Sequence, residues 1–159
     1  MKMRRPLYGF RMSRWSILPT DSAGVLTVRL SRESQYGLEG LCVLARQPEG
    51  TIMLLSEIAE AGRLPAGFLA QIFQKLARHN VVSSHRGAVR GYALARSPEA
   101  ISVKEIVEAI EGRDLFERCI FWPGRCGENQ PCRLHERWGP VRHTLTEMME
   151  RTTLKDVAS

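Results

Sequence analysis

Between residues 56 and 95, two helix-forming stretches are followed by two strand-forming ones, and this order constrains the fold more than any other feature. The stretch 57–61 is a short helix that Ser56 can cap and Gly62 can end. Pro65 suits the first turn of a second helix, because its missing N–H costs nothing there. Two helices joined by a short turn containing glycine form the helix-turn-helix pattern.

The second helix has an apolar face and a small or polar face. The apolar positions recur at helical spacing, and they are Leu69, Ile72, Phe73 and Leu76. The opposite face carries Gly67, Ala70, Gln71, Gln74, Lys75 and Arg78. We expect this face to meet DNA, with Gln71 and Gln74 as base readers.

The stretches 81–85 and 91–95 then predict two short strands, joined by a turn that carries Arg86 and Arg90. A helix-turn-helix followed by a hairpin is a winged helix. The predicted fold class is therefore mostly α (α+β), a winged helix-turn-helix with a β-hairpin wing.

Charge supports the same interpretation. Residues 61–98 contain no Asp or Glu, and the formal net charge of the chain is +6. A long one-sign run on a helix-turn-helix and hairpin is typical of a surface for DNA phosphates, although a generally basic surface without nucleic acid is the alternative. The residues predicted to bind double-stranded DNA are Ser56, Gly67, Gln71, Gln74, Lys75, Arg78, Ser83, Ser84, Arg86 and Arg90.

Helices are also predicted on either side of this unit. Ser31 can cap a helix that runs to about Arg46, with Leu38, Leu41, Cys42 and Ala45 on one face. Because Cys42 belongs to that stripe, we interpret it as a buried small hydrophobe rather than a metal ligand. After the wing, a helix buries Ile101, Ile106, Val107 and Ile110, and Gly112 ends it. Its other face is acidic and should point away from DNA.

Three cysteines and a histidine follow, Cys119, Cys126, Cys132 and His135, with six, five and two residues in the gaps. From residue 123 to 131, glycine, proline, polar and charged residues surround the cysteines, and we expect this segment to have too little apolar surface to order itself by burial. Thiolates and an imidazole can hold iron or zinc, and the metal bonds would then order the loop. A metal-free thiol switch is a third possibility.

The last helix has heptad spacing at Leu134, Trp138, Val141, Leu145 and Met148. We predict that this seam packs against a second copy of the chain, because paired recognition helices would then meet a two-fold symmetric operator. Packing on its own domain is the alternative. Pro140 lies inside the pattern and predicts a kink or a break near Trp138.

The ends and the cysteine count add three expectations. Residues 1–27 are basic and predict a disordered extension or an upstream sequence from a misassigned start, with a DNA-contacting arm as the alternative. Four cysteines, three of them clustered, favour a reducing compartment over a disulfide scaffold. No apolar stretch is long enough to span a membrane.

From residue 28 to 157 the chain resembles the Rrf2 family of winged-helix regulators, which includes the iron–sulfur cluster assembly regulator and the nitric-oxide-sensitive repressor. Family chains usually begin Met-Arg-Leu, where this one has Val28-Arg29-Leu30. The three-cysteine loop is part of the match. The other matching stretches are 28–31 (VRLS), 55–60 (LSEIAE), 68–73 (FLAQIF), 82–87 (VSSHRG), 101–106 (ISVKEI) and 153–157 (TLKDV).

The resemblance implies a dimeric, cytoplasmic bacterial regulator whose loop cysteines bind an iron–sulfur cluster. Family members take a fourth ligand either three residues after the last cysteine, here His135, or in the first helix, here Gln35. An amide is a poor ligand, so His135 is preferred. The first loop gap has six residues where well-known members have five, which leaves the cluster type open, with 2Fe–2S favoured over 4Fe–4S. Arg90 replaces the first of the paired glycines that commonly end the family wing.

Together these observations predict a transcription regulator that senses redox state, nitric oxide or iron–sulfur status through a cluster. A zinc-stabilised or clusterless repressor is the alternative. A thiol redox enzyme is disfavoured, because paired carboxylates, a nucleophile with its base and a phosphate loop were not found. The predicted organisation is a basic extension (1–27), a winged helix-turn-helix (28–98), a linking helix (99–118), a metal loop (119–135) and a dimerisation helix with a tail (136–159).

Overall fold

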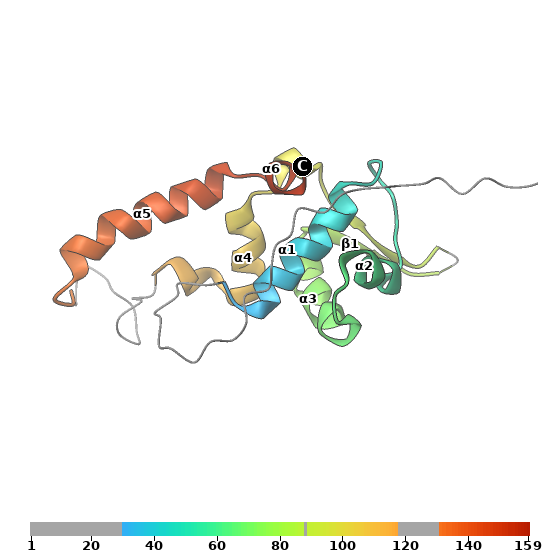
Figure 1. Ribbon diagram of the computed structural model, residues 1–159, viewed down its shortest axis with the longest axis horizontal. Helices are drawn as coiled ribbons and strands as arrows, with labels where there is room; N and C mark the ends of the chain where they lie inside the picture. The colour runs from blue at the N-terminus through green and yellow to red at the C-terminus, as the bar shows by residue number, and fades with distance from the viewer. Residues whose placement is uncertain (1–29, 88, 118–130) are drawn as a thin grey trace, which may run out of the picture.

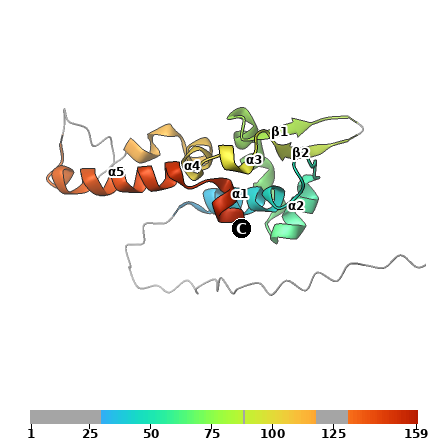
Figure 2. The same ribbon diagram turned by 90° about the horizontal axis from the view of Figure 1, so that it is seen from above.

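The structure, a computed structural model, describes residues 30–87, 89–117 and 131–159. The predictions for residues 1–27, Cys119 and Cys126 lie outside the described residues. The predicted fold class is confirmed, since the described part is mostly α-helical, with two short 3-10 helices (Pro98–Ala100 and Arg113–Glu117) and one small antiparallel hairpin. The hairpin and helix α5 project from opposite ends of the molecule (Figures 1 and 2).

Helix α1 (Arg32–Ala45) lies at the centre and contacts α2, α3, α4 and α6. Ser31 caps it as predicted, because its hydroxyl accepts a hydrogen bond from the Ser34 amide. Leu41 and Cys42 are buried in the core. Gly37 and Gly40 allow close approach: a Cβ on Gly40 would lie 2.9 Å from the Phe73 ring, and one on Gly37 would overlap the Ile110 side chain.

Helices α2 (Leu55–Gly62) and α3 (Ala66–Arg78) form the predicted helix-turn-helix, but the ends of α2 differ from the prediction. Ser56 is not the cap, because the helix begins at Leu55, two residues before the predicted start at Glu57, and the Glu57 carboxylate accepts the Leu54 N–H at 2.8 Å. Gly62 remains helical, and Arg63 ends the helix with a left-handed backbone (φ 53°). Pro65 precedes the first residue of α3.

The hairpin consists of β1 (Val82–His85) and β2 (Gly91–Leu94), paired antiparallel with Val82 opposite Leu94. Met53 forms an isolated bridge with Tyr92, which ties the segment before α2 to the hairpin. Gly91 has φ 149°, and a Cβ there would overlap the Met53 carbonyl. Arg90, in contrast, has no positive φ, so the missing glycine of the family pattern causes no left-handed strain.

Helix α4 (Val103–Glu111) is capped by the Ser102 hydroxyl, and Gly112 (φ 101°) ends it as predicted. Helix α5 (His135–Arg151) is continuous, so of the kink or break predicted near Trp138 the break is wrong, and the kink stays a prediction. Pro140 is the sixth residue of α5, and its missing N–H leaves the Glu136 carbonyl without its helical donor.

The chain ends with α6 (Leu154–Ala158), which returns to the core and packs on α1 (Figure 1). A capping box between Thr153 and Asp156 starts it. Its Leu154 is fully buried, and its Val157 carbonyl accepts a hydrogen bond from Cys42 Sγ at 3.7 Å. Cys42 is therefore a core residue as predicted, and burial raises the pKa of its thiol.

Candidate nucleic-acid interface

Helix α3 presents to solvent the face that the sequence predicted. Its four apolar stripe residues are buried, and Gly67, Gln71, Gln74 and Arg78 are exposed. The predicted base readers are therefore accessible on the outer side of the helix. Around Gly67 the space is open, since a Cβ there would meet nothing within 4 Å.

The wing supplies a second basic element. Arg86 and Arg90 are exposed and stand on either side of the hairpin turn. Together with the start of α2 they border a hollow of about 360 Å³. The lining residues with polar side chains are Ser56, Ser84, His85, Arg86, Arg90 and Tyr92. Two guanidinium groups and three hydroxyls are donors that suit a phosphate group.

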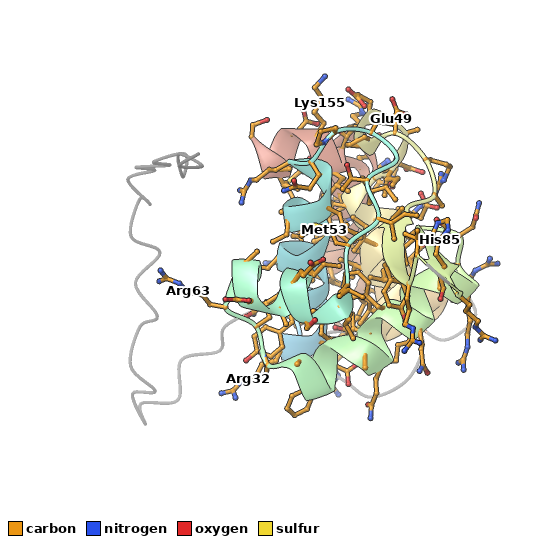
Figure 3. The ribbon with its side chains drawn as sticks, turned by 90° about the vertical axis from the view of Figure 1, so that its right-hand side faces the viewer. Arg32, Glu49, Met53, Arg63, His85 and Lys155 are labelled. Carbon is orange, nitrogen blue, oxygen red and sulfur yellow. The ribbon has the colours of Figure 1, made fainter. Side chains whose placement is uncertain are left out.

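The six basic residues of the acid-free stretch do not all face the same way. Figure 3 places Arg63 on the side of the domain opposite His85 and the hairpin. The guanidinium of Arg96 is paired with Glu105 on α4. Within the described residues, Arg78, Arg86 and Arg90 have no carboxylate partner, so these three carry the unpaired positive charge of the α3 and wing surface.

The ammonium group of Lys75 makes its contacts within the protein. It lies 2.5 Å from Glu33 Oε2 on α1 and donates a hydrogen bond of 3.2 Å to the Ile110 carbonyl near the end of α4. Ser83 is also engaged, because its hydroxyl donates to the Ala93 carbonyl and lies 3.1 Å from His85 Nε2. DNA contact by either residue stays a prediction.

The predicted metal ligands are only partly described. Cys132 is half-buried and outside the core, and the His135 amide donates to its carbonyl at 2.9 Å, so both residues belong to the turn that begins α5. This turn lies at the end of α5 farthest from the hairpin (Figure 1). Gln35 donates to the Leu30 carbonyl. The donor set of three thiols and one imidazole suits iron or zinc chemically.

Helix α5 carries the predicted dimerisation residues and buries none of its own side chains. Val141 and Met148 are each 54% exposed, and Leu134, Trp138 and Leu145 are partly exposed. Leu134 immediately precedes the helix. Because these apolar side chains are exposed or only partly buried, the seam has apolar surface that a partner helix could cover.

Sequence reasoning missed two features of the surface. One is the Lys75–Glu33 pair, whose members are 42 residues apart in the chain and show no local signal. The other is Phe68 in the first turn of α3, which is 59% exposed. Its position outside the apolar stripe of α3 could have revealed it.

The described residues thus form a winged helix-turn-helix with a basic α3 and wing surface. The model of the Rrf2 family, described as an iron-dependent transcriptional regulator, matches residues 30–159. The chain belongs to the Rrf2 family of transcriptional regulators, whose members bind DNA. None of its described helices combines the length and apolar composition that a bilayer crossing requires.

Named relatives agree with this assignment. CymR of Bacillus subtilis is 30% identical over 132 residues, which cover 83% of this chain and 91% of CymR. IscR of Escherichia coli is 26% identical over 132 residues, which cover 83% of this chain and 81% of IscR. Both are named HTH-type transcriptional regulators.

Solved structures are similar as well. The structure of CymR, described as the global cysteine regulator of B. subtilis, matches with a TM-score of 0.68 at 29% identity, over 83% of this chain and 97% of that one. IscR of T. potens matches with a TM-score of 0.63 at 25% identity, over 82% and 85% of the two chains.

Proposed function

We propose that this regulator binds double-stranded DNA, with α3 in the major groove and the wing on the adjacent phosphate backbone of the DNA. The observation that carries the proposal is the set of three arginines, Arg78, Arg86 and Arg90, that have no carboxylate partner in the described residues and lie in a stretch without acidic residues. Gln71 and Gln74 would read bases, and the hollow beside Ser84 would hold a phosphate.

The test measures binding to random-sequence duplexes over a range of salt concentrations. Arg86→Ala should weaken binding to every sequence and lower the salt slope by about one, because one phosphate contact is lost. Arg63→Ala is the matched control, since this arginine lies on the other side of the domain (Figure 3) and should leave the slope unchanged. Equal slopes for Arg86→Ala and the parent chain would exclude Arg86 from the interface.

The proposal includes a homodimer in the cytoplasm. The exposed apolar seam of α5 supports the homodimer, because a second copy would cover Val141 and Met148. Two recognition helices related by a two-fold axis would then meet a two-fold symmetric operator.

We further propose that Cys119, Cys126, Cys132 and His135 hold an iron–sulfur cluster, of the 2Fe–2S type in preference to 4Fe–4S. Support comes from the donor set, from the turn shared by Cys132 and His135, and from the similarity to IscR. A bound cluster would supply a centre whose occupancy depends on iron, oxidants or nitric oxide. Because α5 begins at His135 and projects from the end of the molecule opposite the hairpin (Figure 1), a cluster held there would influence DNA binding through the position of α5.

A regulator without a cluster is the second candidate, and the similarity to CymR favours it. CymR is described as a cysteine regulator, and its structure has a higher TM-score than that of IscR. In this case the loop thiols would act by thiol chemistry or hold zinc.

Anaerobic purification followed by iron, sulfide and zinc analysis separates these candidates. Iron and sulfide in equal amounts, with visible absorbance that Cys126→Ala abolishes, would support the cluster. Colourless protein with one zinc per chain would support a structural metal, and protein without metal would support the clusterless regulator. Visible absorbance retained in Cys126→Ala would exclude Cys126 as a cluster ligand.

A further inference from the structure

The first turn of α3 exposes an aromatic ring where a DNA-binding helix meets base edges. Phe68 is the third residue of α3 and is 59% exposed. It is absent from the hydrophobic core and from the partly buried residues that pack against it. The exposed surface of the Phe68 ring is therefore available for contact with another molecule.

The surroundings of Phe68 favour DNA as the group that covers it. Gly67 leaves open space beside it, and Gln71 lies one helical turn further along. The stretch from residue 61 to 98 has no acidic side chain, and exposed Arg78 lies on the same helix. Residues at the N-terminal end of a recognition helix reach base edges in the major groove.

We propose that Phe68 is a specificity-determining residue that selects thymine by packing on its 5-methyl group. Thymine alone among the four bases presents a methyl group in the major groove, and phenylalanine is among the side chains that contact it. The inference rests on the proposed function, because it requires α3 to lie in that groove.

The test uses a duplex selected by the full chain from a random pool. Each thymidine is then replaced singly by deoxyuridine, which lacks only the methyl group. The parent chain should lose affinity about fourfold at one or two thymines of each half-site, the factor expected when one methyl group loses its apolar contact. Phe68→Ala should bind the thymine duplex more weakly by a similar factor and show no further loss with uracil.

Two variants make the result specific. Phe68→Leu retains an apolar side chain and should keep part of the thymine preference. Val89→Ala removes another exposed apolar side chain, 62% exposed near the wing turn, and should leave the preference unchanged. The thermal unfolding temperature of Phe68→Ala should stay near that of the parent chain, because the ring is largely outside the core.

The outcomes are distinct. Uracil sensitivity in Phe68→Ala equal to that of the parent chain, or no sensitivity of the parent chain at any thymine, would overturn the role of Phe68 while DNA binding stands. Failure of the parent chain to bind any duplex would overturn the proposed function and this inference together.

Discussion

At the scale of single residues, the structure separates basic side chains that are available from those that are already paired. Lys75 and Arg78 lie on the same helix, and the sequence predicted both to contact DNA. In the structure, Lys75 joins α3 to Glu33 on α1 and to the Ile110 carbonyl at the end of α4, while DNA contact by Lys75 stays a prediction. A partly exposed pair of this kind contributes about 1 kcal/mol or less to stability, so its main effect is on the position of α3.

Substitution of each residue by methionine should therefore give different results. Arg78→Met should lower the salt slope of DNA binding by about one, because a phosphate contact disappears. Lys75→Met should leave the slope near that of the parent chain. Filter binding at several salt concentrations measures both. A slope that falls equally in the two variants would show that Lys75 leaves Glu33 to contact DNA.

A second cluster joins the start of α1 to the end of α4. The buried Ser34 hydroxyl donates to Glu111 Oε1 at 2.7 Å. Burial acts to raise the pKa of the Glu111 carboxyl, but hydrogen bonds from Ser31 and Ser34 and the charge of Lys75 outweigh it, so its pKa lies below the ordinary value of 4.5. A lowered carboxyl pKa stabilises the fold above the unfolded-state value, and this stabilisation is lost as pH falls through the folded-state value.

Ser34→Ala should destabilise the fold by about 1–2 kcal/mol at neutral pH, because a hydrogen bond to a charged group is removed. The difference from the parent chain should shrink once pH falls below 4.5, as Glu111 becomes protonated. Urea unfolding over this range measures it. In a Glu111→Gln background the effect of Ser34→Ala should not vary with pH; a variation that persisted there would assign it to another group.

At the scale of elements, apolar spacing and turn residues predicted helices α1 to α5 and the hairpin but not α6, which the sequence assigned to a tail, and contacts between elements set some of the ends. The α3 stripe and the Gly112 stop follow from local sequence. The start of α2 does not, because the Glu57 carboxylate and the packing of Leu55 against the core move it ahead of Ser56. Likewise, the need for glycine at position 91 comes from the segment around Met53, which lies 38 residues before Gly91 in the chain and pairs with the hairpin.

Gly91→Ala should lower the free energy of unfolding by about 2–4 kcal/mol, because a Cβ would meet the Met53 carbonyl at a backbone conformation that favours glycine. Gly67→Ala is the control. That glycine is helical with open space around it, so alanine should be neutral or stabilise by up to about 1 kcal/mol. Urea unfolding midpoints compare the two, and equal midpoints would contradict the close contact at Gly91.

At the scale of the whole molecule, the last two helices, α5 and α6, pack differently. Helix α6 returns to the core, where Leu154 is fully buried and the Ala158 carbonyl accepts the Arg46 Nε–H at 2.8 Å. Helix α5 projects from the body and contacts α4 (Figure 2). Its apolar seam therefore has little to cover it within the described chain, which supports a second copy as its partner.

Replacement of Val141 and Met148 together by glutamate should convert a dimer to single chains, because two carboxylates would be buried in the seam. Sedimentation equilibrium measures the mass. His143→Ala, on the same helix with a side chain 74% exposed, should leave the mass unchanged. An unchanged mass in the double variant would show that the copies associate elsewhere or not at all.

The sequence by itself determined the buried stripe of α3 and the stretch where positive charge accumulates, because helical spacing and charge runs are local properties. The tertiary structure decided which of those charges are available. Glu33 meets Lys75 and Glu105 meets Arg96 only after separate helices have packed together. Such pairs depend on the positions of residues distant in the chain, and no local pattern encodes those positions.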